Sequence, residues 1–340
     1  ELWSKILDAR AETGEPYIVN LDNCNDALPQ GQKNLGLEIK QSNLCSEITL
    51  PTNEERTAVC CLSSVNLEHF DDWSEDKNFI QDLITMLDNV LEHFIDNAID
   101  MNNLGGYNAN YERFKKHIKE GKEGFTKAAY SAYRERSIGL GAMGFHSYLQ
   151  AHNIPFEGIY ATGFNHKAFK HIKSSALKAS KEIAKDRGEA PDISGSTLRN
   201  AHLLAVAPNA SSSIICGGTS PSIEPIRANV FTHKTLSGSY KVKNKNLEKL
   251  INKKLDEPAK RKKLWQQISD NRGSIQNIRL FTKEEKELYK TADEINQIWV
   301  VEHAYKRQEF ICQSQSVNLF FILPDSSKNQ EQHNEYLQYV

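Results

Sequence analysis

The chain has few cysteines and no excess of either charge. Six cysteines in 340 residues are too few for the disulfide framework of a small secreted protein, so a reducing, cytoplasmic location is expected. A formal net charge of −2 gives no electrostatic reason to expect nucleic acid or an acidic membrane surface as a partner. No apolar run approaches the roughly 20 residues that a membrane-spanning helix needs. With 39% hydrophobic and 25% charged residues, the chain is expected to be globular and soluble.

Metal and processing signals are also missing. The chain has no Cys-x-x-Cys pair and no two histidines at i, i+4, and the close pair His166 and His171 would not share a helix face. A bound metal is therefore not expected. No secretory signal peptide opens the sequence, which begins at Glu1 without a methionine, and we expect a fragment or a processed product.

The segment "QSNLCSEITLP", residues 41–51, places a thiol between an amide and a carboxyl group. In an extended segment, residues i, i+2 and i+4 point to the same side, so Asn43, Cys45 and Glu47 are predicted to share one face. Three such groups aimed at one point suit chemistry on a small molecule. The alternative is a strand in which Cys45 is only a small buried hydrophobe. The segment alone leaves both interpretations open.

Hydrophobic spacing in the rest of the chain predicts a mixed α/β domain. Strands are predicted at 17–19, 56–67 and 203–207, and amphipathic helices at 76–103 and 165–187. The first of these helices presents one apolar stripe, formed by Ile80, Leu83, Leu87, Val90, Leu91, Phe94, Ile95 and Ala98. No repeat or linker divides the chain, so we expect one domain or most of one.

Two short motifs allow a nucleotide-binding interpretation. Gly139, Gly141 and Gly144 spell G-x-G-x-x-G, but no strand is predicted before them, which favours close packing of a helix start against a sheet. The second motif, "PNASSS" at 208–213, follows a buried strand and opens a predicted helix. Its backbone N–H groups and hydroxyls suit a phosphate, and an ordinary serine N-cap is the alternative.

The later part of the chain is rich in lysine. Residues 260–263 form a basic cluster, which we interpret as part of a solvated insertion rather than a binding patch. Thr282 and Glu285 have the spacing of a capping box and predict the start of a helix there. Tyr336 and Tyr339 fall on a predicted amphipathic helix, so a redox role for them is not favoured.

Six segments, taken in order, resemble the large, catalytic subunit of class I ribonucleotide reductase, in its C-terminal portion. They are "YIVNLDNCN", "QSNLCSEITLP", "AVCCLSSVNL", "RSIGLGAMGF", "APNASSSIICGGTSPSIEPIRANVF" and "FICQSQSVNLFF". The resemblance implies an α/β fold that is part of a ten-stranded α/β barrel, with a finger loop carrying the radical cysteine. It implies thiyl-radical reduction of ribonucleoside diphosphates to deoxyribonucleoside diphosphates for DNA synthesis.

The resemblance also assigns roles to residues. Cys45 would form the thiyl radical that abstracts the 3′ hydrogen, Glu47 would accept the 3′ hydroxyl proton, and Asn43 would hydrogen-bond the substrate hydroxyls. Cys60 would be one half of a redox-active disulfide, with a partner cysteine that precedes this chain. Strand alternation points Cys61 away from Cys60, so Cys61 is assigned to packing. The other cysteines receive the same assignment: Cys24, Cys216 and Cys312. The substrate diphosphate would be held by Pro208, Asn209, Ala210, Ser211 and Ser212, with Ser213 beside them.

By the same resemblance, no cofactor is bound directly. The radical would come from a metal-containing small subunit, and the electrons from thioredoxin or glutaredoxin. Further partners would be an N-terminal half or complementing chain and a second large subunit in a homodimer. The expected segments are 1–72 (strands and finger loop), 73–200 (helical), 201–235 (phosphate-loop strand and helix), 236–300 (Lys-rich helical insertion) and 301–340 (late barrel strand and the start of a helix).

Two other functions stay open from the sequence. One is a catalytically inactive nucleotide-binding or subunit-interaction module derived from that fold; the presence of Asn43, Cys45, Glu47 and Cys60 argues against it, because such a module would be free to lose them. The other is a thiol enzyme that uses Cys45 as nucleophile and His69 or His93 as base.

Overall fold

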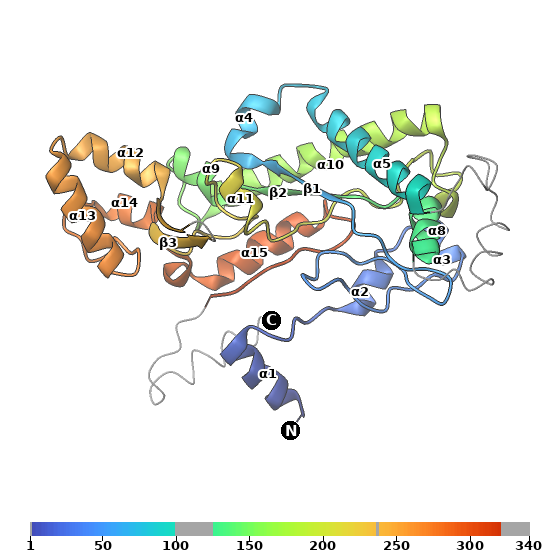
Figure 1. Cartoon of the computed structure of the whole chain (residues 1–340), viewed down its shortest axis with the longest axis horizontal. Helices are drawn as coiled ribbons and strands as arrows, with labels where there is room; N and C mark the ends of the chain where they lie inside the picture. Colours follow the sequence, from blue (N-terminus) through green and yellow to red (C-terminus); the bar gives the residue numbers. More distant parts are fainter. Residues whose placement is uncertain (1, 99–124, 236–237, 321–340) are drawn as a thin grey trace.

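The computed structural model describes residues 2–98, 125–235 and 238–320 (Figure 1). The elements of its first half are α1 (Leu2–Thr13), α2 (Leu21–Asp26), α3 (Gln30–Asn34), β1 (Leu62–Asn66), η1 (Leu67–His69), α4 (Phe70–Trp73), α5 (Phe79–Ala98), α8 (Phe125–Glu135), β2 (Gly139–Met143), α9 (Phe145–Ala151) and α10 (Ile159–Arg187). Those of its second half are η2 (Pro191–Ile193), α11 (Ser212–Ile215), β3 (Val230–Thr235), β4 (Gly238–Lys243), α12 (Lys245–Lys254), α13 (Pro258–Asp270), α14 (Lys283–Leu288), η3 (Ala292–Glu294) and α15 (Gln297–Gln308).

A parallel pair of strands lies at the centre of the fold. β1 and β2 are hydrogen-bonded in a register that runs from Leu62 opposite Gly139 to Asn66 opposite Met143. Both strands are short, and η1 follows β1 directly as α9 follows β2. Parallel pairs are usually covered by helices on their faces, and here α5 and α10 lie together over one face (Figure 1).

Two extended segments continue this layer beyond β2. Leu140 N donates to Leu203 O (2.8 Å), and Val206 forms a parallel bridge with Gln315. Ser314 N in turn donates to Glu47 O (3.0 Å), which brings the 41–51 segment to the end of the row. Residues 203–206 of the predicted strand are thus extended and buried, and backbone hydrogen bonds join them to β2 on one side and to residues 313–316 on the other. The described residues form an open row of parallel segments and no closed barrel.

The glycine motif lies on a strand, not at a helix start alone. Gly139 and Gly141 belong to β2, and only Gly144 precedes α9. A Cβ added at Gly141 would lie 2.5 Å from Ala205 O, so glycine is required for the segments to approach this closely. The predicted close packing of the glycines is confirmed. The prediction that they begin a helix was wrong for Gly139 and Gly141, because a short buried strand shows no alternating pattern in the sequence.

The long helices were predicted closely. α5 buries Ile80, Leu87, Leu91 and Ile95 in the main core, as its apolar stripe indicates. Val90 does not belong to that stripe, since 52% of it is exposed. α10 begins earlier than predicted, at Ile159, and ends where Gly188 takes a positive φ. No helix among the described residues has the length and apolar composition to cross a membrane.

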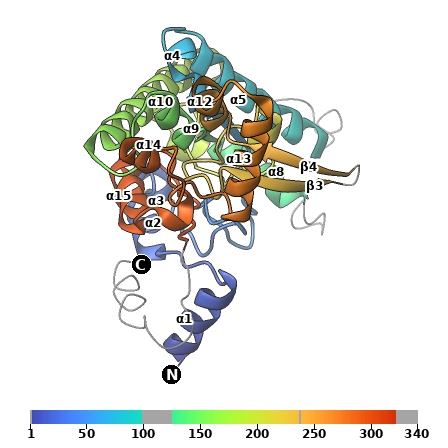
Figure 2. The same ribbon diagram turned by 90° about the vertical axis from the view of Figure 1, so that its left-hand side faces the viewer.

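The lysine-rich region folds around a small core of its own. β3 and β4 form an antiparallel hairpin that extends outward from α12 and α13 (Figure 2). Leu247, Ile251, Trp265 and Ile268 are buried together with residues of α14, separately from the main core. The prediction of a helical insertion at 236–300 was therefore incomplete, because β4 lies inside it. The capping box of Thr282 is confirmed at the start of α14.

Two further predictions, one near the start of the chain and one in its last segment, differ from the structure. Residues 17–19 are irregular rather than a strand, and helix α2 follows them. In the segment 301–340, α15 continues to Gln308, and the extended stretch begins after it. The helix predicted at the end of the chain, with Tyr336 and Tyr339, lies outside the described residues.

Candidate active site

The loop that carries Cys45 is a tight turn. Asn43 N donates to Ile48 O (3.2 Å), and Ile48 N donates to the side-chain Oδ1 of Asn43 (3.0 Å). Ser46 has φ +65, and Ser46 N closes the turn on Asn43 O (3.1 Å). The predicted extended alternation of residues 43, 45 and 47 is therefore wrong. Asn43 holds the turn with its amide oxygen, and Cys45 lies half-buried within the turn.

Glu47 is a buried carboxylate with an unused oxygen. Only 3% of the residue is exposed, and its Oε2 has no hydrogen-bond partner among the described residues. Burial first, and then the Glu47 charge, raise the pKa of the Cys45 thiol. Cys60 is an exposed residue, and the partial burial of its thiol, followed by the charges of Glu47 and Cys45, raises its pKa. The Glu47 charge thus acts on both the Cys45 and the Cys60 thiols.

The neighbouring cysteines point to opposite faces of the β1 layer. The front face is the side of Cys60, Leu62 and Ser64, where Leu62 packs against Ile48. The back face is the side of Cys61, whose thiol donates to Leu87 O on α5 (3.6 Å). Burial raises the pKa of Cys61 to about 11. The assignment of Cys61 to packing is confirmed.

The serine loop, residues 208–213, lies against this front face. Asn209 has φ +52, and its Oδ1 accepts a hydrogen bond from Ser64 Oγ of β1 (3.1 Å). Its Nδ2 donates to Ser212 Oγ (3.2 Å). The backbone amides of Ala210, Ser211 and Ser212 donate to no other backbone group of the described residues. These three N–H groups have no acceptor within the described part of the chain, which suits an anionic ligand.

The predicted N-cap interpretation of this loop was wrong. α11 has four residues, and Ser211 at its N-cap makes no side-chain capping bond. Pro208 and Asn209 are half-buried, Ala210 and Ser211 exposed, and Ser213 buried. The serine side chains are therefore not used to begin a helix.

A polar group formed by Tyr17, Asn318 and Glu224 was missed from the sequence. Tyr17 OH donates to Asn318 Oδ1 (3.5 Å), and Asn318 Nδ2 donates to the buried carboxylate of Glu224 (2.7 Å). Burial, then the charges of Glu15, Cys45 and Glu224, raise the pKa of Tyr17. No local signal could have found this group, since its members lie about 200 and 300 positions from Tyr17 in the chain.

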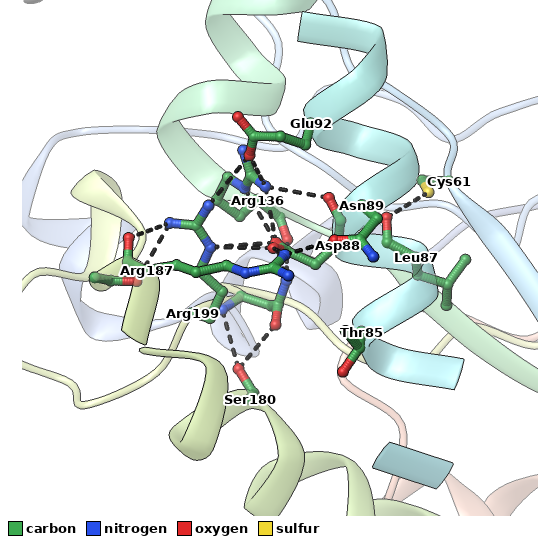
Figure 3. A network of polar contacts seen from close by, with 12 residues as sticks. Cys61, Thr85, Leu87, Asp88, Asn89, Glu92, Arg136, Ser180, Arg187 and Arg199 are labelled. Carbon is green, nitrogen blue, oxygen red and sulfur yellow. Dashed lines mark hydrogen bonds and ion pairs between the residues drawn. The ribbon is translucent and has the colours of Figure 1, made fainter. Parts of the chain in front are cut away.

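The back face carries a saturated network of charges (Figure 3). Asp88 of α5 is fully buried and pairs with Arg136 (2.9 Å), Arg187 (2.9 Å) and Arg199 (3.2 Å). Glu92 pairs with Arg136 (2.6 Å) and with Arg199. Burial opposes the charge of Asp88, but the arginines outweigh it and hold the pKa of Asp88 below its ordinary value. This network joins α5 to the segments before β2 and after α10.

The remaining cysteines differ from one another. Cys24 is half-buried, and Cys216 is exposed, so the packing assignment fails for Cys216. Cys312 Sγ accepts from Leu203 N (3.0 Å) and Leu204 N (3.2 Å). Burial would raise its pKa, but the hydrogen bond of His202 and the nearby positive charges lower it to about 6. Packing alone therefore does not describe Cys312.

The histidines proposed as bases have other partners. His69 Nδ1 lies 3.0 Å from the Asp72 carboxylate, and His93 contacts Asn97 on α5. The charge that acts on Cys45 is that of Glu47. The structure therefore does not pair Cys45 with His69 or His93. The described residues contain no cluster of three side chains suited to a metal ion.

Comparison with known proteins identifies the family. The family described as "Ribonucleotide reductase, barrel domain" matches residues 1–198 and 190–339. The ribonucleoside-diphosphate reductase large subunit of Invertebrate iridescent virus 3 is 47% identical over 94% of this chain and 47% of its own length. The large chain from Cryptosporidium parvum is 32% identical over 94% of this chain and 40% of its own. This chain spans less than half the length of these two relatives.

A solved structure gives the same result. The class Id ribonucleotide reductase alpha subunit of Actinobacillus ureae superposes with a TM-score of 0.81 at 36% identity, over 99% of this chain and 58% of that one. The chain therefore belongs to the ribonucleotide reductase large-subunit family and contains a mixed α/β part of its barrel domain.

Proposed function

We propose that this chain carries the nucleotide-reducing site of a ribonucleoside-diphosphate reductase. The observation that supports this most is the cluster of Cys45, Glu47 and Cys60 on the front face, with one Glu47 oxygen unpaired. A buried carboxylate without a partner is costly, and a substrate hydroxyl would supply the missing hydrogen bond. The serine loop lies against the same face, through its contact with Ser64.

The chemistry begins at Cys45. As a thiyl radical, its sulfur takes the 3′ hydrogen atom of the ribose, so a C–H bond breaks and an S–H bond forms. Glu47 Oε2 accepts the proton of the 3′ hydroxyl, because an ionised carboxylate in hydrogen-bond reach acts as a general base. Removal of both hydrogens from one C–OH group activates the neighbouring carbon for loss of its hydroxyl.

Cys60 completes the reduction. It gives its proton to the departing 2′ hydroxyl, which leaves as water, and with a second thiol it supplies two electrons and ends as a disulfide. The hydrogen of the second thiol ends on the 2′ carbon. Cys45 then returns its hydrogen atom to the 3′ carbon and is again a thiyl radical, and Glu47 returns its proton to the 3′ oxygen. The sum is one ribonucleoside diphosphate and two thiols converted to one deoxyribonucleoside diphosphate, one disulfide and one water.

The remaining residues bind and orient the substrate. The amides of residues 210–212 would hold the diphosphate. Asn43 uses its Oδ1 to close the turn, so its NH₂ group is the part that would donate to a ribose hydroxyl. The radical would be supplied by a metal-containing small subunit, and a thioredoxin or glutaredoxin would reduce the disulfide. An N-terminal half and a second large subunit would complete the assembly.

The test is Cys45→Ser in the complete enzyme with its small subunit and CDP. A hydroxyl keeps the size of the thiol but does not form the radical, so dCDP formation should fall to background while CDP still binds within about twofold of wild type. Cys216→Ser, at an exposed cysteine, is the matched control and should turn over normally. Turnover by Cys45→Ser at the wild-type rate would reject the proposal.

A further inference from the structure

Ser64 has no role in the chemistry above, yet among the described residues it makes the one side-chain hydrogen bond between β1 and the serine loop. Its Oγ donates to Asn209 Oδ1 (3.1 Å), and Asn209 Nδ2 donates to Ser212 Oγ (3.2 Å). We propose that Ser64 is a positioning residue that sets the direction of hydrogen bonding in the serine loop and thereby the affinity for a diphosphate. The inference rests on the proposed role of that loop.

The argument depends on which atom donates at each step. An amide side chain has a carbonyl that only accepts and an NH₂ group that only donates. Because Ser64 donates to the carbonyl oxygen of Asn209, the NH₂ group of Asn209 is turned towards Ser212. The Ser212 oxygen is then an acceptor on that side, and its own O–H proton is left to donate outwards. The chain runs Ser64 to Asn209 to Ser212 and ends on a donor, which an anionic phosphate oxygen requires.

The backbone of the loop depends on the same residue. Asn209 lies in the left-handed region at φ +52, a conformation that asparagine tolerates better than most residues. Its carbonyl oxygen accepts from Ser213 N (3.0 Å). The three amides without backbone acceptors therefore lie between two anchored residues, Asn209 and Ser213. Loss of the Ser64 contact would release the side chain that fixes the first anchor.

The hydroxyl of Ser64 lies close to the neighbouring strand β2. Ser64 lies opposite Gly141 in the β1–β2 register. A Cβ on Gly141 would lie 3.2 Å from Ser64 Oγ and still closer to Ala205 O. The position of the hydroxyl is thus set by two parallel strands rather than by a flexible loop. Ser64 also shares the front face with Cys60, so one strand would carry both a redox thiol and the support of the phosphate-binding loop.

The experiment compares Ser64→Ala with Ser63→Ala in the complete protein. Ser63 is adjacent, and its side chain points to the other face of β1. Binding of inorganic pyrophosphate, CDP and cytidine is measured by calorimetry, and kcat and KM for CDP by dCDP formation. Loss of one hydrogen bond that orders the loop should weaken pyrophosphate and CDP binding about five- to tenfold, with a matching rise in KM. Cytidine binding and kcat should stay within about twofold, as should every value for Ser63→Ala.

Two further variants sharpen the result. Ser64→Thr keeps the hydroxyl and should restore most of the lost affinity. Asn209→Asp cannot donate to Ser212 and adds a negative charge, so it should weaken pyrophosphate binding more than Ser64→Ala does. Unchanged pyrophosphate affinity in Ser64→Ala, or a fall in kcat with KM unchanged, would overturn the inference about Ser64. Failure of the wild-type protein to bind pyrophosphate or CDP would instead overturn the proposed role of the loop.

Discussion

The front and back faces of β1 use polar groups in opposite ways. On the back face, the buried carboxylate of Asp88 is paired with three arginines, and the Cys61 thiol donates to a backbone carbonyl. On the front face, one oxygen of Glu47 and the amides of the serine loop have no partner among the described residues. A buried polar group that stays unpaired costs stability, so the unpaired oxygen of Glu47 supports the proposal that the front face binds the substrate. The back face stabilises the fold, and the front face is the one to which we assign the chemistry.

The largest effect is expected from Glu47→Gln. The amide keeps the shape of the side chain but cannot accept the 3′ hydroxyl proton, so kcat for CDP reduction should fall by about 10²- to 10⁴-fold. The KM should change little, since the side chain is not expected to bind the diphosphate. Steady-state dCDP formation measures both constants. A kcat within a few-fold of wild type would show that the unpaired Glu47 oxygen has no catalytic role. The contrast between the front and back faces of β1 would then not reflect function.

Asp88→Asn tests the back face. Three arginines would lose their shared buried partner, and the free energy of unfolding should fall by about 3–5 kcal/mol. Chemical denaturation of the complete protein measures the change. Glu182→Gln is the matched control, because Glu182 forms an exposed pair with Lys185 and should change stability by under about 0.5 kcal/mol. Equal effects of the two substitutions would contradict a structural role for the network.

Glu135 is a second buried carboxylate, and unlike Glu47 it accepts a side-chain hydrogen bond. Gln32 Nε2 donates to it (3.2 Å), and burial raises the pKa of Glu135 from 4.5 to about 7. Between these pH values the folded protein holds a proton that the unfolded chain has lost. This group therefore makes folding less favourable as pH rises from about 4.5 through about 7, by up to about 3 kcal/mol at roughly 1.4 kcal/mol for each pH unit.

Glu135→Gln removes that dependence. The stability difference between wild type and variant, measured by denaturation at several pH values, should shift in favour of the variant as pH rises and become constant above about pH 8. The difference is needed because burial also lowers the pKa of His146 to about 3 and of His303 to about 4, and these groups stabilise the fold as pH rises. A difference that does not vary with pH would show that Glu135 titrates normally.

The sequence predicted those parts whose determinants are close together in the chain. The apolar stripe of α5 and the capping box of Thr282 and Glu285 depend on residues three or four positions apart, and both are present. The 41–51 segment forms a turn, where an extended alternation was predicted. Its turn is closed by hydrogen bonds between Asn43 and Ile48 and by the positive φ of Ser46, which an alternating pattern does not reveal.

Contacts between distant segments were beyond the reach of sequence patterns. Ser64 and Asn209 are 145 positions apart, and only the parallel packing of β1, β2 and the 202–206 segment brings them together. The same holds for the Tyr17, Asn318 and Glu224 group. Sequence patterns also gave no sign that Asp88, at a position inside an amphipathic helix, would collect three arginines.

The most direct test is to follow the two neighbouring cysteines through one turnover. The complete enzyme is reduced, freed of reductant and given CDP, and the thiols that remain are alkylated after unfolding and quantified by mass spectrometry. The account predicts that Cys60 disappears from the free-thiol pool in proportion to the dCDP formed, while Cys61 stays fully alkylated. Formation of dCDP with Cys60 still free, or with Cys61 lost in its place, would contradict the assignment of the front face of β1 as the site of reduction.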